Sequence, residues 1–196
     1  MLRTLILAAG VFFATVMFSY ATVLDGVVLP DTLTIGDEAL QLNGAGLRVK
    51  NIGPIHKGVY VAALYLKEKC CDFNKIINAD ETMVLRLNIV TSLVTSERFA
   101  NQTLKGFTEV TQGNIAPIQN GINDFLSVFA EEINDGDLFE IVYQKGVGIQ
   151  VFKNGSKESK ITITGLPIKS ALFGIWLGHR SEKSMQVLAK NLLDVH

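Results

Sequence analysis

The chain has 196 residues, of which 19% are charged, and its 18 Lys and Arg nearly balance its 19 Asp and Glu. This length suits one domain with a hydrophobic core of its own. The sequence contains no run of like charges, so the electrostatic pattern of a nucleic-acid binder is missing. We therefore expect no nucleic-acid partner.

The N-terminus has the pattern of a secretory signal peptide. Arg3 precedes a mainly apolar run from Leu5 to Met17, and Ser19-Tyr20-Ala21 places small residues where signal peptidase needs them. We expect residues 1–21 to be a signal peptide and residues 22–196 to form the domain, exported to the periplasm. The alternative is an uncleaved anchor in the inner membrane, because the apolar run approaches the ~20 residues that span a bilayer.

Cysteine and histidine positions argue against disulfides and metal sites. The two cysteines, Cys70 and Cys71, are neighbours, and a bridge between them would fall outside the usual disulfide geometry, so we expect free thiols. The three histidines, His56, His179 and His196, lie far apart, and the sequence has no His-Glu-x-x-His, Gly-x-Ser-x-Gly or phosphate-loop motif. We expect no metal and no other cofactor.

The first part of the domain has the pattern of β-structure. Short runs rich in Val, Leu, Ile, Thr and Tyr are separated by turn residues such as Gly36-Asp37 and Gly53-Pro54. The last run alternates, because Met83, Leu85, Leu87 and Ile89 share one side of the pleat. The pattern predicts strands at residues 27–30, 32–35, 39–42, 47–52, 59–66 and 82–90, with 47–52 and 59–66 as a hairpin.

Helical spacing follows these strands. Thr95 or Ser96 can cap a helix that lines up Phe99, Thr103, Phe107 and Val110, and a second helix begins near Pro117 and ends near Asn134. Three short strands then form a meander, and Pro167 and Ser181 introduce two final helices. These elements are predicted at 138–143, 147–152, 160–164, 168–176 and 182–193. Blocks of strands and helices without strict βαβ alternation predict an α+β fold, with a largely antiparallel sheet and helices packed on one face.

Two segments resemble the chalcone isomerase family. In the first, Asn43-Gly44-Ala45-Gly46-Leu47-Arg48 enters one strand and Val59-Tyr60-Val61-Ala62-Ala63-Leu64-Tyr65-Leu66 forms its neighbour; the second is Phe173-Gly174-Ile175-Trp176-Leu177-Gly178, before the last helix. The order of elements agrees over nearly the whole domain. The chain is more similar to the bacterial branch, which carries a signal peptide, than to the plant enzymes. The resemblance implies a chalcone isomerase-like open-faced sandwich.

Arg48 is the first candidate for a binding residue. Gly44 and Gly46 let the backbone turn and approach a ligand closely, and the strand that follows would hold the donor fork of the arginine. If the hairpin closes around Pro54, Arg48 and Tyr60 face each other and point to the same side of the sheet. A guanidinium and a phenol together can hold a carboxylate or a phenolate. The alternative is an ion-paired or surface Arg48 and a core Tyr60.

The resemblance implies roles for this pair. In the plant chalcone isomerases the arginine that matches Arg48 stabilises an oxyanion during ring closure, and in fatty-acid-binding members an Arg and a Tyr hold the ligand carboxylate. The isomerases carry a threonine in place of Tyr60 and a Tyr, Lys and Asn stripe where this chain has Thr95, Arg98 and Gln102. We therefore expect a non-catalytic protein that binds a small amphipathic ligand, such as a fatty acid. Two alternatives stay open: an intramolecular lyase with Arg48 as its catalytic residue, and an interaction protein that does not use the pocket.

Overall fold

The computed structural model describes residues 21–52 and 55–194, and its centre is a curled antiparallel sheet. Each strand of this seven-stranded sheet pairs with the next strand in the sequence. A separate two-stranded hairpin precedes it, formed by β1 (Ala21–Leu24) and β2 (Val27–Pro30). The strands of the large sheet are β3 (Thr32–Ile35), β4 (Glu38–Ile52), β5 (Ile55–Leu66), β6 (Met83–Ile89), β7 (Leu138–Gln144), β8 (Gly148–Lys153) and β9 (Thr162–Ile163).

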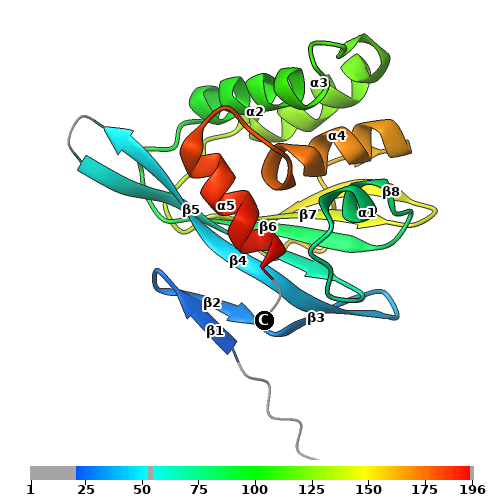
Figure 1. The fold of residues 1–196 in the computed structure, drawn as a ribbon, viewed down its shortest axis with the longest axis horizontal. Coiled ribbons are helices and arrows are strands. Elements are labelled where there is room, and N and C mark those ends of the chain that lie inside the picture. The colour runs from blue at the N-terminus through cyan, green and yellow to red at the C-terminus, as the bar shows by residue number, and fades with distance from the viewer. Residues whose placement is uncertain (1–20, 53–54, 195–196) are drawn as a thin grey trace, which may run out of the picture.

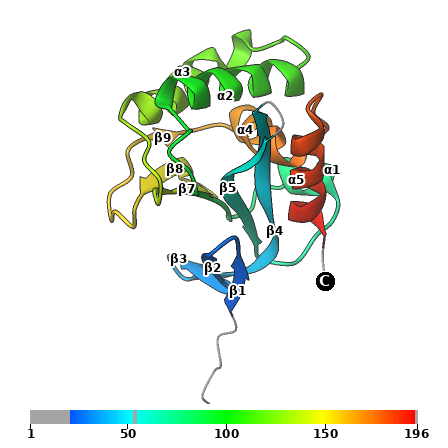
Figure 2. The same cartoon turned by 90° about the vertical axis from the view of Figure 1, so that its left-hand side faces the viewer.

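The helices interrupt this meander and gather on one face of the sheet, while the β1–β2 hairpin lies against the other face (Figures 1 and 2). This arrangement confirms the predicted α+β open-faced sandwich with a largely antiparallel sheet. The helices are α1 (Phe73–Asn78), α2 (Ser96–Val110), α3 (Gln119–Ser127), α4 (Leu166–Leu177) and α5 (Lys183–Leu193), with short 3-10 turns η1 (Ala116–Ile118) and η2 (Val128–Ala130) on either side of α3.

The main core lies between the sheet and the helices. The predicted alternation in β6 is confirmed, because Met83, Leu85, Leu87 and Ile89 all belong to this core. Four phenylalanines bring α2, α3, η2 and β7 together through ring contacts with centroids 4.4 to 5.3 Å apart; they are Phe99, Phe125, Phe129 and Phe139. Complete burial of one such side chain contributes roughly 1.5–3 kcal/mol, so this cluster helps to fix α2 above the sheet.

Helix α4 lies at the centre of the helical layer and contacts α1, α2 and α5. It is apolar on nearly all sides, as expected for a helix without a solvent face. Lys169 is its buried exception, and its Nζ donates to the carbonyl oxygens of Ile76, Ile77 and Ala79 at 2.9, 2.9 and 2.7 Å. These bonds satisfy carbonyls at the end of α1 that have no partner within the helix. Burial lowers the pKa of Lys169 to about 8.

Strand β4 corrects the predicted turn at Gly44 and Gly46. The segments predicted separately at 39–42 and 47–52 form one strand, and both glycines lie inside it. Their missing side chains make room for α5: a Cβ at Gly44 would lie 2.7 Å from the carbonyl oxygen of Leu192, and one at Gly46 2.9 Å from Leu188 Cδ1. These glycines therefore serve helix packing, where the sequence suggested a close approach to a ligand.

Other boundaries also differ from the predictions. Helix α1 was not predicted, because it has six residues and only Ile76 is buried, too few for a helical period to be visible. The helix expected from Pro117 to Asn134 is divided into η1, α3 and η2. His56-Lys57-Gly58, expected as a turn, belongs to β5.

The predicted signal peptide, residues 1–21, lies outside the described residues except for Ala21, which begins β1. Within residues 21–52 and 55–194, no helix has the length and apolar character needed to cross a bilayer.

Candidate ligand-binding site

A cavity of about 390 Å³ lies between the β4–β5 hairpin, the start of α2 and the corner where α4 leads into α5. This volume falls within the roughly 300–1,000 Å³ typical of small-molecule sites. Apolar side chains form much of the wall: Val59, Leu93, Val94, Phe99, Ile175, Trp176 and Met185. The polar side chains around it are mostly cationic, with Glu182 as the one acidic member: Arg48, Lys50, Lys57, Tyr60, Arg98, Gln102, Thr103, Arg180 and Glu182.

Arg48 and Tyr60 both line this cavity. They are directly paired across β4 and β5, so the pairing predicted for these two residues is confirmed, although the register shifts by one residue between Arg48 and Val49. Both are buried, with exposed fractions of 6% and 7%. Their place beside a cavity agrees with the predicted site, and their role in ligand binding stays a prediction.

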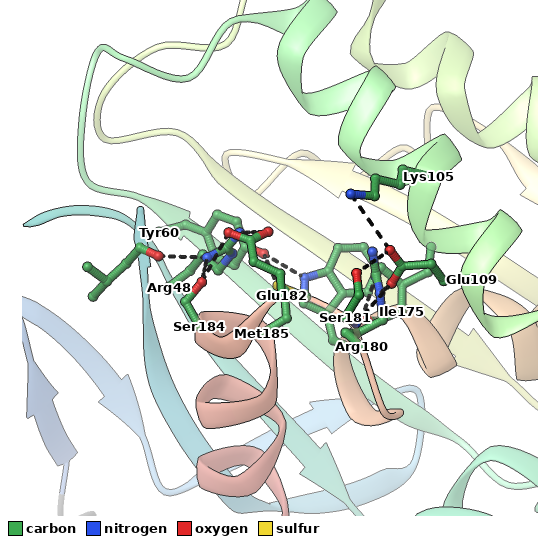
Figure 3. Close-up of polar contacts among 12 residues, drawn as sticks. Arg48, Tyr60, Lys105, Glu109, Ile175, Arg180, Ser181, Glu182, Ser184 and Met185 are labelled. Atoms are coloured by element: carbon green, nitrogen blue, oxygen red, sulfur yellow. Dashed lines mark hydrogen bonds and ion pairs between the residues drawn. The ribbon is translucent and has the colours of Figure 1, made fainter. Parts of the chain in front are cut away.

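Arg48 is held by the N-terminal end of α5 (Figure 3). Its Nη2 lies 2.7 Å from Glu182 Oε2, and its Nη1 donates to Ser184 Oγ and to the carbonyl oxygen of Val49, the latter at 2.6 Å. Ser184 in turn donates to Glu182 Oε1 at 3.1 Å. Burial raises the pKa of Glu182, but the bond and charge of Arg48, the Ser184 bond and the charge of Lys50 together outweigh burial and keep that pKa below its usual value. Arg48 is therefore a buried, ion-paired arginine that also lines the cavity.

Tyr60 points to the same region from β5. Its hydroxyl oxygen accepts a hydrogen bond of 3.1 Å from Trp176 Nε1, and its own proton faces Met185 Sδ at 4.0 Å. Burial raises the pKa of Tyr60 above its ordinary value, so the side chain is a neutral phenol at physiological pH. Because a thioether is a weak acceptor, a ligand oxygen could take this proton in preference to Met185.

A second ion pair fastens the α4–α5 corner to α2. Arg180 Nε lies 2.6 Å from Glu109 Oε2, and Ser181 Oγ donates to Glu109 Oε1 at 2.7 Å. Gly106 permits this approach, because a Cβ there would lie 2.7 Å from Arg180 Nη1. Ser181 was expected to cap α5, but the N-cap position falls on Glu182, whose side chain makes no capping bond. The Ser181 hydroxyl instead bonds Glu109 and so connects the α4–α5 corner to α2.

Several residues of the site were not found from the sequence. Trp176, Glu182 and Ser184 lie 116 to 136 residues from the strand residues that they contact, and no local pattern marks such pairs. Of the helix stripe singled out in the sequence, Arg98 and Gln102 line the cavity, whereas Thr95 caps α2 by accepting from the Arg98 amide at 3.3 Å. Among the described residues, no group of three or more His, Cys, Asp or Glu is placed to hold a metal ion.

Comparison with known proteins places this architecture in a family. A family model described as chalcone isomerase-like matches residues 21–193. The chain belongs to the chalcone isomerase-like family. The crystal structure of a fatty-acid-binding protein from Arabidopsis thaliana matches this chalcone isomerase-like chain with a TM-score of 0.70 and 17% identity, over 89% of this chain and 96% of that chain. A search of curated proteins gives no match.

The cavity of this chalcone isomerase-like protein combines cationic and phenolic donors with an apolar wall. A guanidinium carries five N–H donors, and the bonds found for Arg48 among the described residues use three of them. The remaining donors and the Tyr60 proton can meet one acidic group, and the apolar wall can cover a hydrocarbon chain.

Proposed function

We propose that this protein binds a fatty acid or a similar amphipathic carboxylate in the cavity, without catalysis. One observation carries the proposal: the apolar cavity contains a buried arginine that already holds a carboxylate, that of Glu182 at 2.7 Å. The Glu182 carboxylate is bonded by Arg48 and by the Ser184 hydroxyl, as a ligand head group would be. Membership of a family whose fold includes a fatty-acid-binding protein supports the same reading.

The hydrocarbon chain of the ligand supplies most of the affinity in this proposal. Each buried methylene contributes about 0.8 kcal/mol before ordering costs. A charge-assisted hydrogen bond to the head group contributes roughly 1.5–3 kcal/mol net. Chain length should therefore change the affinity more than the chemistry of the head group does.

The proposal excludes efficient chalcone isomerisation for an electrostatic reason. An arginine stabilises a developing oxyanion best when its charge is uncompensated, whereas Arg48 already shares its charge with Glu182. The Tyr60 hydroxyl accepts from Trp176 and stands where the isomerases carry a threonine. Conversion of a chalcone should be no faster than in buffer, and a stereoselective flavanone product that disappears in Arg48→Ala would contradict this.

Calorimetric titration tests the binding proposal directly. The purified protein is titrated with saturated fatty acids of increasing chain length and with the matching alcohols. We expect affinity to rise with chain length and the acids to bind more tightly than the alcohols by about tenfold. Equal binding of acids and alcohols would show that no carboxylate is recognised, and no binding of either would reject the lipid ligand.

We also propose that the protein is exported and loses residues 1–21. The support is the order of Arg3, the apolar run and the small residues before position 22. Intact-mass measurement of the protein isolated from its native envelope should give a chain that starts near Thr22. A mass that includes Met1 would favour the alternative of an uncleaved anchor.

A further inference from the structure

The cavity is lined by more positive charge than the single negative charge of a carboxylate ligand can neutralise. Five basic residues line the cavity, and the two arginines among them that are buried are already compensated, Arg48 by Glu182 at 2.7 Å and Arg180 by Glu109 at 2.6 Å. The other three are Lys50, Lys57 and Arg98. The ion pairs found within residues 21–52 and 55–194 include none of these three.

The two lysines form a like-charge pair on the hairpin. Lys50 and Lys57 are direct partners across β4 and β5. Like charges directly opposite each other on neighbouring strands are destabilising. Both side chains are exposed, so water weakens the repulsion, and Glu182, whose charge also attracts Lys50, is already bonded to Arg48. An anion between the two ammonium groups would remove this cost.

A β-bulge brings Lys57 to the cavity. The register shifts after Arg48, since Arg48 pairs with Tyr60 but Val49 pairs with Gly58, which leaves Val59 as an extra residue of β5. Side chains alternate between the faces of a strand, so Lys57, three residues before Tyr60, would otherwise point to the opposite face. The bulge restores Lys57 to the face that carries Tyr60. Lys50, two residues after Arg48, already shares that face.

Arg98 adds a third charge from the helical layer. It lies in the first turn of α2, and its Nη1 donates to the carbonyl oxygen of Leu93 at 3.3 Å. That carbonyl is neutral, so it orients the guanidinium without cancelling its charge. Three cations from three segments of the chain, β4, β5 and α2, therefore line one cavity.

We propose that the ligand head group carries a second negative charge and is a phosphate monoester on an alkyl or acyl chain. This inference rests on the proposed function and names the ligand class of the same cavity. A phosphate monoester carries a charge of about −1.5 to −2 at neutral pH and offers three acceptor oxygens. One oxygen meets Arg48 and Tyr60, and the others accept from Lys50, Lys57 and Arg98. A carboxylate, with one negative charge, leaves most of the charge of Lys50, Lys57 and Arg98 uncompensated.

The test compares ligands that differ only in the head group. The protein is titrated calorimetrically with dodecyl phosphate, dodecanoic acid and dodecanol below their aggregation concentrations, and with inorganic phosphate alone. We expect dodecyl phosphate to bind about tenfold more tightly than dodecanoic acid, and inorganic phosphate to bind far more weakly than either. The variant Lys50→Gln/Lys57→Gln should lose the advantage of the phosphate, so that dodecyl phosphate and dodecanoic acid bind it with similar affinity.

A matched variant controls for net charge. Lys157→Gln/Lys190→Gln also removes two exposed lysines, and neither lines the cavity, so it should keep the tenfold preference. If dodecanoic acid binds and dodecyl phosphate binds no more tightly, the inference is wrong and the proposed function stands. If no alkyl ligand binds, both are wrong. Inorganic phosphate that binds as tightly as dodecyl phosphate would reject a lipid as its source.

Vesicles distinguish the head group of a bound ligand from a membrane surface. Basic residues also attract anionic bilayers, at about 1 kcal/mol each. The wild type and both double variants are sedimented with phosphatidylglycerol vesicles and with phosphatidylcholine vesicles. If Lys50→Gln/Lys57→Gln no longer sediments with vesicles but binds dodecyl phosphate as the wild type does, the inference is wrong and the two lysines serve membrane docking.

Discussion

At Arg48, a ligand must share the guanidinium with a carboxylate that belongs to the protein. Glu182 and Ser184 hold one side of the side chain, and the Val49 carbonyl takes a further donor. A buried arginine without a partner would be costly, because its charge has been removed from water. The internal ion pair therefore stabilises the empty site and also competes with an incoming acid.

Removal of Arg48 should weaken ligand binding more than removal of the Tyr60 hydroxyl. Arg48→Ala should lower fatty-acid affinity by about ten- to a hundredfold, and Tyr60→Phe, which loses one neutral donor, by roughly three- to tenfold. Calorimetric titration of each variant measures the effect. Arg86→Ala provides a control, since Arg86 lies on β6 and pairs with Glu140 at 3.1 Å, outside the cavity. Unchanged affinity in Arg48→Ala would make Arg48 a structural residue only.

Neutralising Glu182 should have the opposite effect on binding. Glu182→Gln keeps the size of the side chain but removes the charge that competes for Arg48, so affinity for a fatty acid should rise by about three- to tenfold. The free energy of unfolding of the unliganded protein should fall, because buried Arg48 loses its counter-ion. Titration and chemical denaturation measure the two changes. Weaker binding in Glu182→Gln would mean that Glu182 positions Arg48 for the ligand and does not compete with it.

Between elements, the site depends on how closely α5 approaches β4. Gly44 and Gly46 lie under this helix, and Asn43 joins it through a bond of 2.8 Å from its Nδ2 to the Leu192 carbonyl oxygen. The other end of α5 presents Glu182 and Ser184 to Arg48. Packing at the glycines therefore determines whether the partners of Arg48 are in reach.

A methyl group at Gly44 should separate the two elements. Its Cβ would lie 2.7 Å from the Leu192 carbonyl oxygen, and backbone on both sides cannot yield easily. Gly44→Ala should reduce the free energy of unfolding by about 1–3 kcal/mol, measured by urea denaturation. Gly174→Ala is the control: its nearest neighbour would be Val110 at 3.7 Å, so it should be neutral or slightly stabilising. Equal effects of the two changes would contradict the packing argument.

Across the whole molecule, the Arg180–Glu109 pair links the helical layer to the cavity and should make stability depend on pH. Burial raises the pKa of Glu109, but the bonds from Arg180 and Ser181 outweigh it and bring the pKa from 4.5 to about 2. A carboxyl whose pKa is lowered by folding stabilises the folded state above its unfolded pKa. This contribution is complete above pH 4.5 and is lost as the pH falls towards 2.

The variant Glu109→Gln isolates this contribution. It should lower the free energy of unfolding at pH 7 by about 2 kcal/mol, a value reduced for partial solvent screening, and the deficit should shrink as the pH falls from 4.5 to 2. Urea denaturation at a series of pH values measures it. Glu158→Gln removes an exposed carboxylate elsewhere and should leave the curve unchanged. A deficit in the free energy of unfolding that stays constant with pH would mean that the contact between Arg180 and Glu109 does not depend on the Glu109 charge.

Local patterns in the sequence were sufficient for most of the elements and for one pairing. Alternation in β6 and the Thr95 cap of α2 depend on neighbours within a few positions. The pairing of Arg48 with Tyr60 was also predicted correctly, although the turn expected at Gly53-Pro54 lies outside the described residues. The family resemblance rested on such segments too, and it is confirmed.

Contacts between distant segments were decided only by the tertiary structure. Glycines 44 and 46 look like a turn in the sequence, because a missing side chain permits both a turn and the close approach of a helix, and only the position of α5 distinguishes them. The ion pair of Arg48 with Glu182 joins residues that no local period relates. The bulge that turns Lys57 towards the cavity shifts the register of β4 and β5 by one residue. The position of this shift is determined by how the two strands pair. The sequence alone thus predicted Arg48 and Tyr60 as a pair on one face of the sheet, and packing decided that Glu182 compensates Arg48 and that both residues line a cavity.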